Sequence, residues 1–587
     1  MTLKYLKIGK YELFAAAIIA FATGLRIVLI AFNWPPTNSD EGVMGIIAMH
    51  IAYHGERPLM FYGQDYMGTI EAYVAALFFH LFGGPSLFAL RLGVVLMVAC
   101  FFIVMYLLTS LLFSKKLALV TLALLSVGSI AYLTRQTLAT GGTAETLLFG
   151  SLSLLLTAWL SLTYRRGVPL RAKLLRCEVY LVLGLIVGLA VWSDLVVAPL
   201  LALAGLLLLL FCWRDLLFGN LPAVLLGILL GFLPSLMYSM QHHLNPLVTL
   251  LSLFHGLDVH PPTTLPGILQ DVYKTIVVSI PTATGNPFCP VQELTFLSDN
   301  TPRTATCEAI RGVWGVGYLV LLGLALVIAF IGLWRLRARL RSETELSAIE
   351  RRGLLVRSVA RLLMLLGGLA TIFAFAVSAA PVWWPAFHAR YLITLLIILP
   401  AVIEPLWNAV STMRAQDGIG NGRGGLVGDK RLVNRAPTSS LSTSSSWGWA
   451  GVRGVIGGGA LVIGALVLLI GTFMTFGEVA AAQRATQNYV NLDSRLVSLG
   501  IKHVKSDYWS CYNISFLSGE RVICQVVSDD LMPGYNRPPH YKEIVKADPH
   551  ASYVIDAPSE MPALLRMMGA GSGKVYRFDG YVVYTPT

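Results

Sequence analysis

The chain has 587 residues, of which 56% are hydrophobic and only 13% charged, and its formal net charge is +12. Soluble domains carry about 25% charged residues, so the composition excludes an ordinary soluble protein and indicates a polytopic membrane protein. In that class the position of each Lys and Arg along the chain sets the orientation, and the net positive charge does not indicate nucleic acid. We therefore expect membrane lipids, and no nucleic acid, as partners.

Long apolar segments predict about eleven transmembrane helices. A helix of about 20 apolar residues is long enough to cross a bilayer. The expected spans cover roughly residues 11–33, 88–113, 117–134, 142–163, 177–193, 195–213, 220–241, 312–334, 355–379, 390–411 and 450–475.

The basic residues predict the orientation of these spans. Lys4, Lys7 and Lys10 precede the first span, and the alternate loops on that side carry most of the remaining Lys and Arg. The positive-inside rule places such loops in the cytoplasm. With eleven spans the C-terminal part then lies outside, and we expect a multi-pass protein of a bacterial plasma membrane.

Two segments after the first span are shorter than a membrane crossing. Residues 67–82 are apolar but include Glu71 and His80, and residues 42–53 are amphipathic. Segments of this kind lie in the membrane interface. We predict that both are interfacial helices in the first external loop.

Composition divides the chain into four parts. Residues 1–411 form the main transmembrane domain, and residues 412–449, rich in Gly, Ser and basic side chains, form a flexible cytoplasmic linker. Residues 450–475 form the last span, and residues 476–587 form a small external α/β domain. In that domain we expect strands at 499–509 and 520–527, a helix at 542–548 and a terminal hairpin at 576–585.

Four cysteines, Cys289, Cys307, Cys511 and Cys524, fall outside, where disulfides form. Residues 511–524 read as two strands joined by a four-residue turn, which would place Cys511 opposite Cys524 and favours a bridge. A two-residue turn would leave the two sulfurs diagonal, and two buried free thiols are the alternative to a bridge.

Asp40 and Glu41 stand side by side in NSDEGVMG, residues 38–45, at the external mouth of the first span. One interpretation is a helix N-terminus, with Ser39 or Asp40 as the N-cap and acidic charge near the positive end of the helix dipole. The other interpretation is a functional site.

Further polar residues converge on the external side and favour the functional site. An Arg suits a lipid-linked phosphate, and a carboxylate can take a proton from an attacking hydroxyl. Charged groups at membrane depth are functional candidates. The converging residues are Glu71, Arg135, Glu145, Asp194, His388, Arg390 and Tyr391.

The sequence also resembles a known superfamily. An acidic pair after the first span is followed by YHGERPLMFYGQDYMGTIEAY and LFFHLFG, and ARYLITLL comes late in the chain. This order is similar to the GT-C membrane glycosyltransferases, in the branch of protein O-mannosyltransferases, lipid A aminoarabinose transferases and RgtA-like proteins. The resemblance covers roughly residues 1–240 and one motif at 380–411. The WWDYG motif of oligosaccharyltransferases is absent.

The resemblance implies an all-α GT-C fold and a polyprenyl-phosphate-linked sugar donor. By the resemblance Asp40 is the catalytic base with Glu41 as support, Glu145 matches an acidic position of the fourth span, and Arg390 matches a phosphate-binding arginine. We add Arg135, Glu71, His388 and Tyr391 as lipid-phosphate or substrate contacts. The lysine-Pro-Pro sequence of the aminoarabinose branch is missing, where this chain has MGTIEA, so the resemblance leaves Arg390, Arg135 or Arg57 to bind the donor phosphate.

These observations predict a glycosyltransferase that acts on a protein, lipid or glycan acceptor at the outer face of the membrane. The alternative is a lipid or glycan transporter or flippase, although repeated halves are not evident in the sequence. We expect no obligatory cofactor, with a divalent cation as the one candidate, and we assign no metal ligands. His50 and His54 have i, i+4 spacing, but no third ligand lies near them in the sequence.

Overall fold

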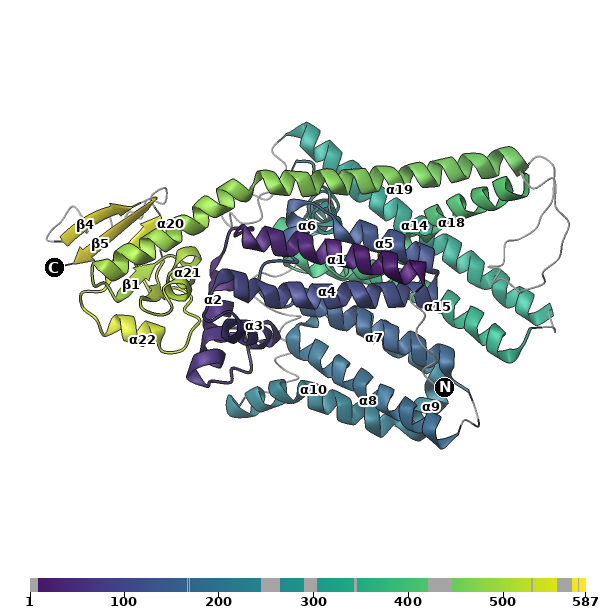
Figure 1. Ribbon diagram of the computed structural model, residues 1–587, viewed down its shortest axis with the longest axis horizontal. Helices are drawn as coiled ribbons and strands as arrows, with labels where there is room; N and C mark the ends of the chain where they lie inside the picture. The colour runs from purple at the N-terminus through teal and green to yellow at the C-terminus, as the bar shows by residue number, and fades with distance from the viewer. Residues whose placement is uncertain are drawn as a thin grey trace.

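The structure, a computed structural model, describes residues 9–165, 167, 169–243, 264–289, 304–342, 346–420, 446–528, 531–556, 573–578 and 580–586. Long helices run side by side in one bundle, and a small domain with a β-sheet covers one end of it (Figure 1). The fold is therefore an all-α membrane domain with a C-terminal α/β domain, as the sequence predicts.

The bundle is built from long apolar helices and the turns that connect them. These elements are α1 (Lys10–Ala31), α4 (Leu87–Leu112), α5 (Lys115–Ser126), α6 (Ile130–Thr134), α7 (Thr143–Thr163), α8 (Leu170–Ser193), η2 (Leu195–Val197), α9 (Ala198–Asp215), η3 (Leu216–Asn220), α10 (Leu221–Gln241), α14 (Ala305–Ser342), α15 (Ala348–Ala376), α18 (Leu395–Gly420) and α19 (Ser446–Gly477).

Shorter helices connect the long ones. These elements are α2 (Ser39–Met49), η1 (His50–His54), α3 (Ile70–Leu81), α12 (Leu265–Lys274), η4 (Thr275–Ser279), α13 (Ile280–Thr284), α16 (Ala380–Trp383), α17 (Pro385–His388) and η5 (Ala389–Leu392). The helices α2 and α3 lie at the end of the bundle that the C-terminal domain covers (Figure 1). Helix α3 falls within the expected segment 67–82, and α2 overlaps the expected segment 42–53 but begins three residues before it.

Eight helical segments of the described residues are long and apolar enough to cross a membrane, or nine if the bent pair 385–392 and 395–411 is one span. The segment Leu195–Gln241 is counted once but holds two of the expected spans. The expected span at 117–134 falls on α5, which has 12 residues, and on the short α6. All eleven expected segments are helical, and their number as crossings stays a prediction.

The helices α8 and α10 pack through glycines. A Cβ placed on Gly184 would lie 2.2 Å from the Val224 carbonyl oxygen, and one on Gly188 would lie 2.5 Å from the Ile228 carbonyl oxygen. Each helix has a G-x-x-x-G spacing, and small residues at this spacing let two helix backbones approach closely in membranes. Gly184 meets Val224 and Gly188 meets Ile228, so residue numbers rise in the same direction along both helices, and α8 and α10 run parallel. The helix α9, which connects them, therefore runs in the opposite direction.

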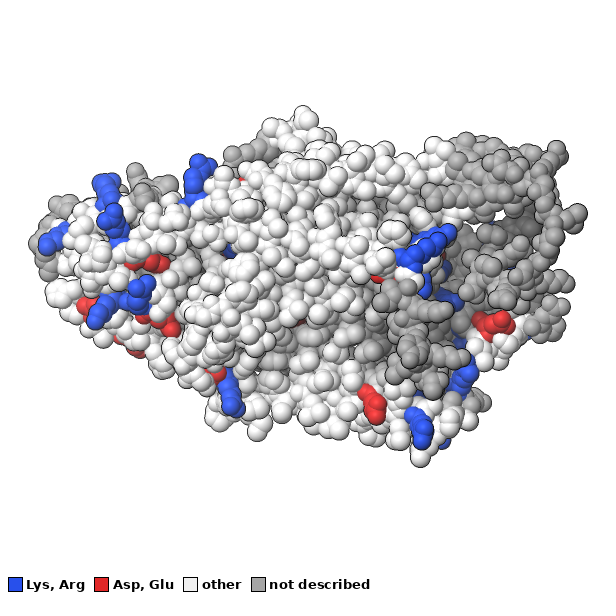
Figure 2. Space-filling view, viewed as in Figure 1, with Lys and Arg blue, Asp and Glu red and all other residues white. Residues whose placement is uncertain are grey.

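Charged side chains gather at the two ends of the face in view and leave a broad uncharged band between them (Figure 2). At the end opposite the C-terminal domain, arginines bind the last carbonyls of neighbouring helices. Arg352 Nε donates to the Ser161 carbonyl at 2.9 Å, and Arg361 Nη2 donates to the Leu112 carbonyl at 2.7 Å. Cations at helix C-termini satisfy unpaired carbonyls and complement the helix dipole.

The described part of the C-terminal domain is a five-stranded mixed sheet in the order β2-β1-β3-β5-β4 with three helices. The pairs β1–β2 and β1–β3 are parallel, and β3–β5 and β4–β5 are antiparallel. Its elements are α20 (Val479–Ser498), β1 (His503–Ser506), α21 (Tyr508–Leu517), β2 (Ile523–Val526), α22 (Tyr541–Lys546), β3 (Ser552–Asp556), β4 (Gly573–Phe578) and β5 (Tyr581–Pro586). The terminal hairpin is confirmed.

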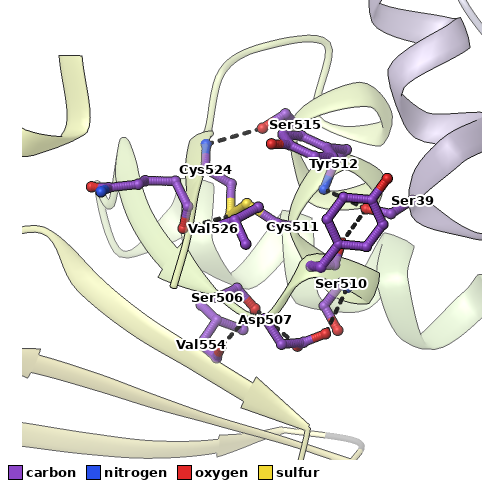
Figure 3. Close-up of a disulfide and its surroundings, with 12 residues drawn as sticks. Ser39, Ser506, Asp507, Ser510, Cys511, Tyr512, Ser515, Cys524, Val526 and Val554 are labelled. Atoms are coloured by element: carbon purple, nitrogen blue, oxygen red, sulfur yellow. Dashed lines mark hydrogen bonds between the residues drawn. A yellow bond between two sulfur atoms is a disulfide. The ribbon is translucent and has the colours of Figure 1, made fainter. Parts of the chain in front are cut away.

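The Cys511–Cys524 disulfide is confirmed, with a Cα–Cα distance of 5.4 Å, but its expected hairpin is wrong. Cys511 lies on helix α21 and Cys524 on strand β2, so the bridge joins a helix to the strand that follows it (Figure 3). Asp507 caps α21 by accepting from the Trp509 and Ser510 amides. Cys289 and Cys307 form a second disulfide.

The linker expected at 412–449 lies mostly outside the described residues. α18 continues to Gly420 and α19 begins at Ser446. The division of the chain into four parts therefore stays a prediction at this boundary.

Candidate active site

The NSDEGVMG segment forms the start of α2. Asn38, and not Ser39 or Asp40, is the N-cap, because its side chain accepts from the Glu41 amide at 3.0 Å. The two carboxylates that follow then point to different neighbours.

Glu41 is fully buried and fully bonded. Arg91 Nε donates to Oε1 at 2.8 Å and Arg91 Nη2 donates to Oε2 at 2.6 Å, while the Ala139 amide donates to Oε1 at 3.1 Å. A buried bidentate pair of this kind fixes α2 against α4. Glu41 therefore supports the position of Asp40 and is not itself available for proton transfer.

Asp40 is held by two side chains of the C-terminal domain. Tyr508 donates to Oδ1 at 2.6 Å, and Arg537 Nη2 lies 3.1 Å from the same oxygen. Burial opposes the charge of Arg537, but Asp40 and Tyr508 raise the pKa of this guanidinium. Among the described residues none donates to Oδ2, and Asp40 is 8% exposed. One carboxylate oxygen is thus anchored and the other is open.

The domain reaches Asp40 because α2 and α21 run side by side. A Cβ on Gly42 would lie 2.6 Å from the Tyr512 backbone, and one on Gly45 would lie 2.5 Å from the Phe516 ring. Ser39 accepts from the Tyr512 amide at 3.3 Å and donates to the Tyr508 carbonyl. Figure 3 shows Ser39 pointing toward α21 near the disulfide. The two glycines of the motif therefore serve domain docking.

The loop that follows Arg135 gathers further carboxylates. The Gly141 amide donates to Glu71 at 2.8 Å, and a Cβ on Gly142 would lie 2.3 Å from the Asp194 side chain. Both glycines have a φ of +80°, which is a conformation that glycine adopts without strain. Burial, together with neighbouring Glu145, raises the pKa of the Glu71 carboxyl well above its ordinary value.

Arg390 lies on η5 among aromatic rings. Its guanidinium lies 4.5 Å from the Phe387 ring centroid and 5.2 Å from that of Tyr391, and it donates to the Tyr391 hydroxyl at 3.3 Å. Its Nε is buried, and no described residue accepts from it. The described ion pairs give carboxylate partners to Arg91, Arg176, Arg361 and Arg537, and none to Arg390.

The other expected phosphate contacts frame Arg390. Arg135 Nη2 donates to the Phe387 carbonyl at 2.9 Å. His388 donates from Nδ1 to the Ala380 carbonyl at 2.7 Å and stacks on the Tyr391 ring. Arg135 and His388 thus hold the segment that carries Arg390.

Tyr66 connects the two halves of the site. Its phenol is buried, which raises its pKa, while the charges of Arg390 and Arg537 act in the opposite direction. Asp194 acts on the same phenol. Arg537, Arg390 and Asp194 therefore lie within electrostatic reach of one side chain.

Sequence reasoning missed Tyr508, Arg537 and Tyr66. Tyr508 and Arg537 lie in the C-terminal domain, more than 460 positions after Asp40, and no local spacing connects them to it. It also missed Glu520, which comes next to His50 and His54 and forms with them the one group of metal-ligand type found among the described residues.

Comparison with known proteins identifies the fold. No family model matches the chain, and no curated protein matches it. ArnT from Cupriavidus metallidurans bound to undecaprenyl phosphate matches with a TM-score of 0.52 and 14% identity, over 99% of this chain and 98% of that chain. Its apo state matches with a TM-score of 0.51 and 14% identity, over 98% and 97% of the two chains.

The chain has the GT-C-like fold of the two ArnT structures. The oligosaccharyltransferase of Archaeoglobus fulgidus tethered with an acceptor peptide is also similar, at 13% identity and a TM-score of 0.47, over 99% of this chain and 74% of that chain. The GT-C-like architecture expected from the sequence is confirmed.

Proposed function

We propose that the chain transfers a sugar from a polyprenyl-phosphate-linked donor to an acceptor at the outer face of a bacterial plasma membrane. Two observations carry the proposal. Asp40 has an open Oδ2, and Arg390, at the same end of the bundle, has no carboxylate partner among the described residues. The ArnT structure of the same fold is bound to undecaprenyl phosphate, which supports a lipid-linked phosphate as the donor group.

Asp40 acts as the base in this proposal. Tyr508 and Arg537 fix Oδ1, so Oδ2 receives the proton of the acceptor hydroxyl. The acceptor oxygen then forms a bond with the anomeric carbon while the bond from that carbon to the lipid phosphate oxygen breaks. A fixed base in hydrogen-bond reach of its proton is what general-base catalysis needs.

Arg390 binds the departing phosphate, which takes the electron pair of the broken bond. A guanidinium aimed at the place where negative charge develops lowers the barrier. Phe387 and Tyr391 hold the group in place. Glu71 and Glu145 lie beside the same loop, and burial together with the neighbouring Glu145 raises the pKa of the Glu71 carboxyl.

The site as a whole favours transfer over transport. The acceptor hydroxyl attacks the face of the sugar opposite the phosphate, and this inverts the configuration at the anomeric carbon. No step of this reaction requires the substrate to cross the helix bundle. A protein, lipid or glycan can serve as the acceptor, and the hydroxyl is the group that Asp40 recognises.

Replacement of Asp40 tests the proposal. Asp40→Asn keeps the shape and can still accept from Tyr508, but its amide cannot take the acceptor proton. We expect transfer from an undecaprenyl-phosphate-linked sugar to fall at least about 100-fold, within the usual range for loss of a general base. Retained turnover by folded Asp40→Asn protein would refute Asp40 as the base, and donor movement across vesicles without transfer would favour the transporter.

A further inference from the structure

A cluster of histidines and acidic side chains lies at the other end of the α2 helix from Asp40. His50 and His54 occupy the π-helical turn η1, one turn apart, and Glu520 follows α21. Their ligand atoms all lie within 4.8 Å of one another. His50 Nε2 lies 2.8 Å from Glu520 Oε1, and His54 Nε2 lies 4.0 Å from Glu520 Oε2.

We propose that His50, His54 and Glu520 form a zinc site that joins the interfacial helix to the C-terminal domain. Zinc takes imidazole nitrogen and carboxylate oxygen at about 2.0–2.2 Å in a tetrahedral arrangement. The three side chains supply two nitrogens and one oxygen, and a water completes the set. His54 is the exposed member, so it can close the remaining distance with little cost to the fold.

Outer contacts orient the ligands as zinc sites require. His50 Nδ1 lies 2.7 Å from the Tyr62 hydroxyl, and Tyr62 donates to Glu56 at 3.1 Å. The Nδ1 proton therefore points to Tyr62, and the Nε2 lone pair of a neutral His50 faces Glu520. A carboxylate behind a histidine is the usual support of a zinc ligand.

The backbone of Glu520 adopts an unusual conformation. Its φ is +59°, which is uncommon for a residue other than glycine. Its amide donates to the Ser515 carbonyl at 2.8 Å, and Tyr541 donates to its Oε1 at 2.5 Å. Backbone and side chain are thus both fixed toward the two histidines.

The zinc site sits on the same helix pair as the candidate active site. Tyr508, at the start of α21, binds Asp40, and Glu520, just after its end, meets His50. Because α2 and α21 run parallel, zinc at one end fixes the placement of Tyr508 at the other. The role that we assign to zinc is therefore structural, and it does not depend on the proposed sugar transfer.

Zinc binding by the full chain tests the site. The protein, with a non-histidine affinity tag, is purified in detergent, treated with EDTA and titrated with zinc chloride against a competing chelator. We expect one zinc per chain in the wild type, and an affinity at least about 100-fold lower in His54→Ala, since loss of a supporting contact alone costs about 10–100-fold. His550→Ala, an exposed histidine of the same domain, is the control and should bind as the wild type.

Thermal unfolding gives a second readout. Zinc should raise the Tm of the wild type and of His550→Ala, and it should leave the Tm of Glu520→Gln unchanged. Magnesium should not replace zinc, because Mg²⁺ prefers oxygen ligands. Equal zinc affinity in His54→Ala and the wild type, or a wild type that binds no zinc, would overturn the proposal. The contact between His50 and Glu520 would then be a hydrogen bond from a protonated His50 Nε2.

Discussion

Asp40 and Glu41 are neighbours in sequence, and the turn of about 100° between consecutive helical residues sends them to different partners. Glu41→Gln removes the charge that compensates buried Arg91. Loss of one partner of a buried ion pair costs about 3–5 kcal/mol, so we expect a clearly lower Tm. Asp40→Asn should lower the Tm less, because Asp40 makes a single contact with Arg537 where Glu41 makes a bidentate one, and the Asn side chain can still accept from Tyr508. Equal Tm values for the two variants would contradict this division of roles.

Arg390 offers a test of donor binding. Hydrogen bonds to charged groups contribute about 1.5–3 kcal/mol, so Arg390→Ala should raise the KM for the lipid donor about 10–100-fold. Arg390→Lys should raise it less, because Lys keeps the charge and loses the bidentate geometry. Arg495→Ala, an exposed arginine in the last turn of α20, is the control. Equal and negligible effects of both Arg390 variants would remove Arg390 from the phosphate site.

At the scale of residues, the sequence predicts side chains that lie close to a recognisable motif. Asp40 and Arg390 follow from their places next to spans and from the resemblance. Their partners do not, because Tyr508, Arg537 and Glu520 reach the site only through docking of a domain more than 460 positions away. The opposite roles of Asp40 and Glu41 also follow from packing, since no local pattern distinguishes two adjacent carboxylates.

At the scale of elements, the α8–α10 contact is the sharpest prediction. Gly227→Ala would place a Cβ 2.2 Å from the Leu181 carbonyl oxygen, so the helices must separate. Overpacking of this kind costs about 1–3 kcal/mol. Gly205 on α9 has no atom within 4 Å of the same position, and Gly205→Ala should be neutral or stabilising. Unfolding temperatures in detergent compare the two, and similar shifts would contradict the close contact.

The sequence predicts the long apolar helices better than the elements of the C-terminal domain. Apolar length locates the long helices well, because a bilayer requires it. The sequence predicts a strand at residues 511–515, although these residues lie in α21, whose residues 510–516 are all buried, so no amphipathic period marks the helix. The Asp507 cap was the available signal. Alternation alone could not separate a buried helix from a buried strand.

At the scale of the whole molecule, the charge pattern and the fold lead to one orientation. Helix α15 begins at the end of the bundle opposite the C-terminal domain (Figure 1), and Arg352 and Arg361, in its first half, bind carbonyls of neighbouring helices. The positive-inside rule favours the first end for the cytoplasm. The two disulfides, Cys289–Cys307 and Cys511–Cys524, suit an oxidising compartment at the other end.

Cysteine labelling tests this orientation. In a background where free Cys100, Cys177 and Cys212 are replaced by Ser, single cysteines are placed by Ser498→Cys at the end of α20 and by Ser342→Cys at the end of α14. Ser444→Cys, which lies outside the described residues, probes the expected linker. A membrane-impermeant maleimide on intact cells should label only Ser498→Cys, because the predicted orientation places the other two positions in the cytoplasm.

Permeabilised cells provide the control, since all three cysteines should then react. Labelling of Ser444→Cys or Ser342→Cys in intact cells would place the basic end of the bundle outside and change the number of crossings. The C-terminal domain would then face a reducing compartment, where Cys511–Cys524 would not persist and where Asp40 could not meet an acceptor at the outer face. The same measurement therefore tests the orientation of the bundle, the compartment of the Cys511–Cys524 disulfide and the side of the membrane on which Asp40 lies.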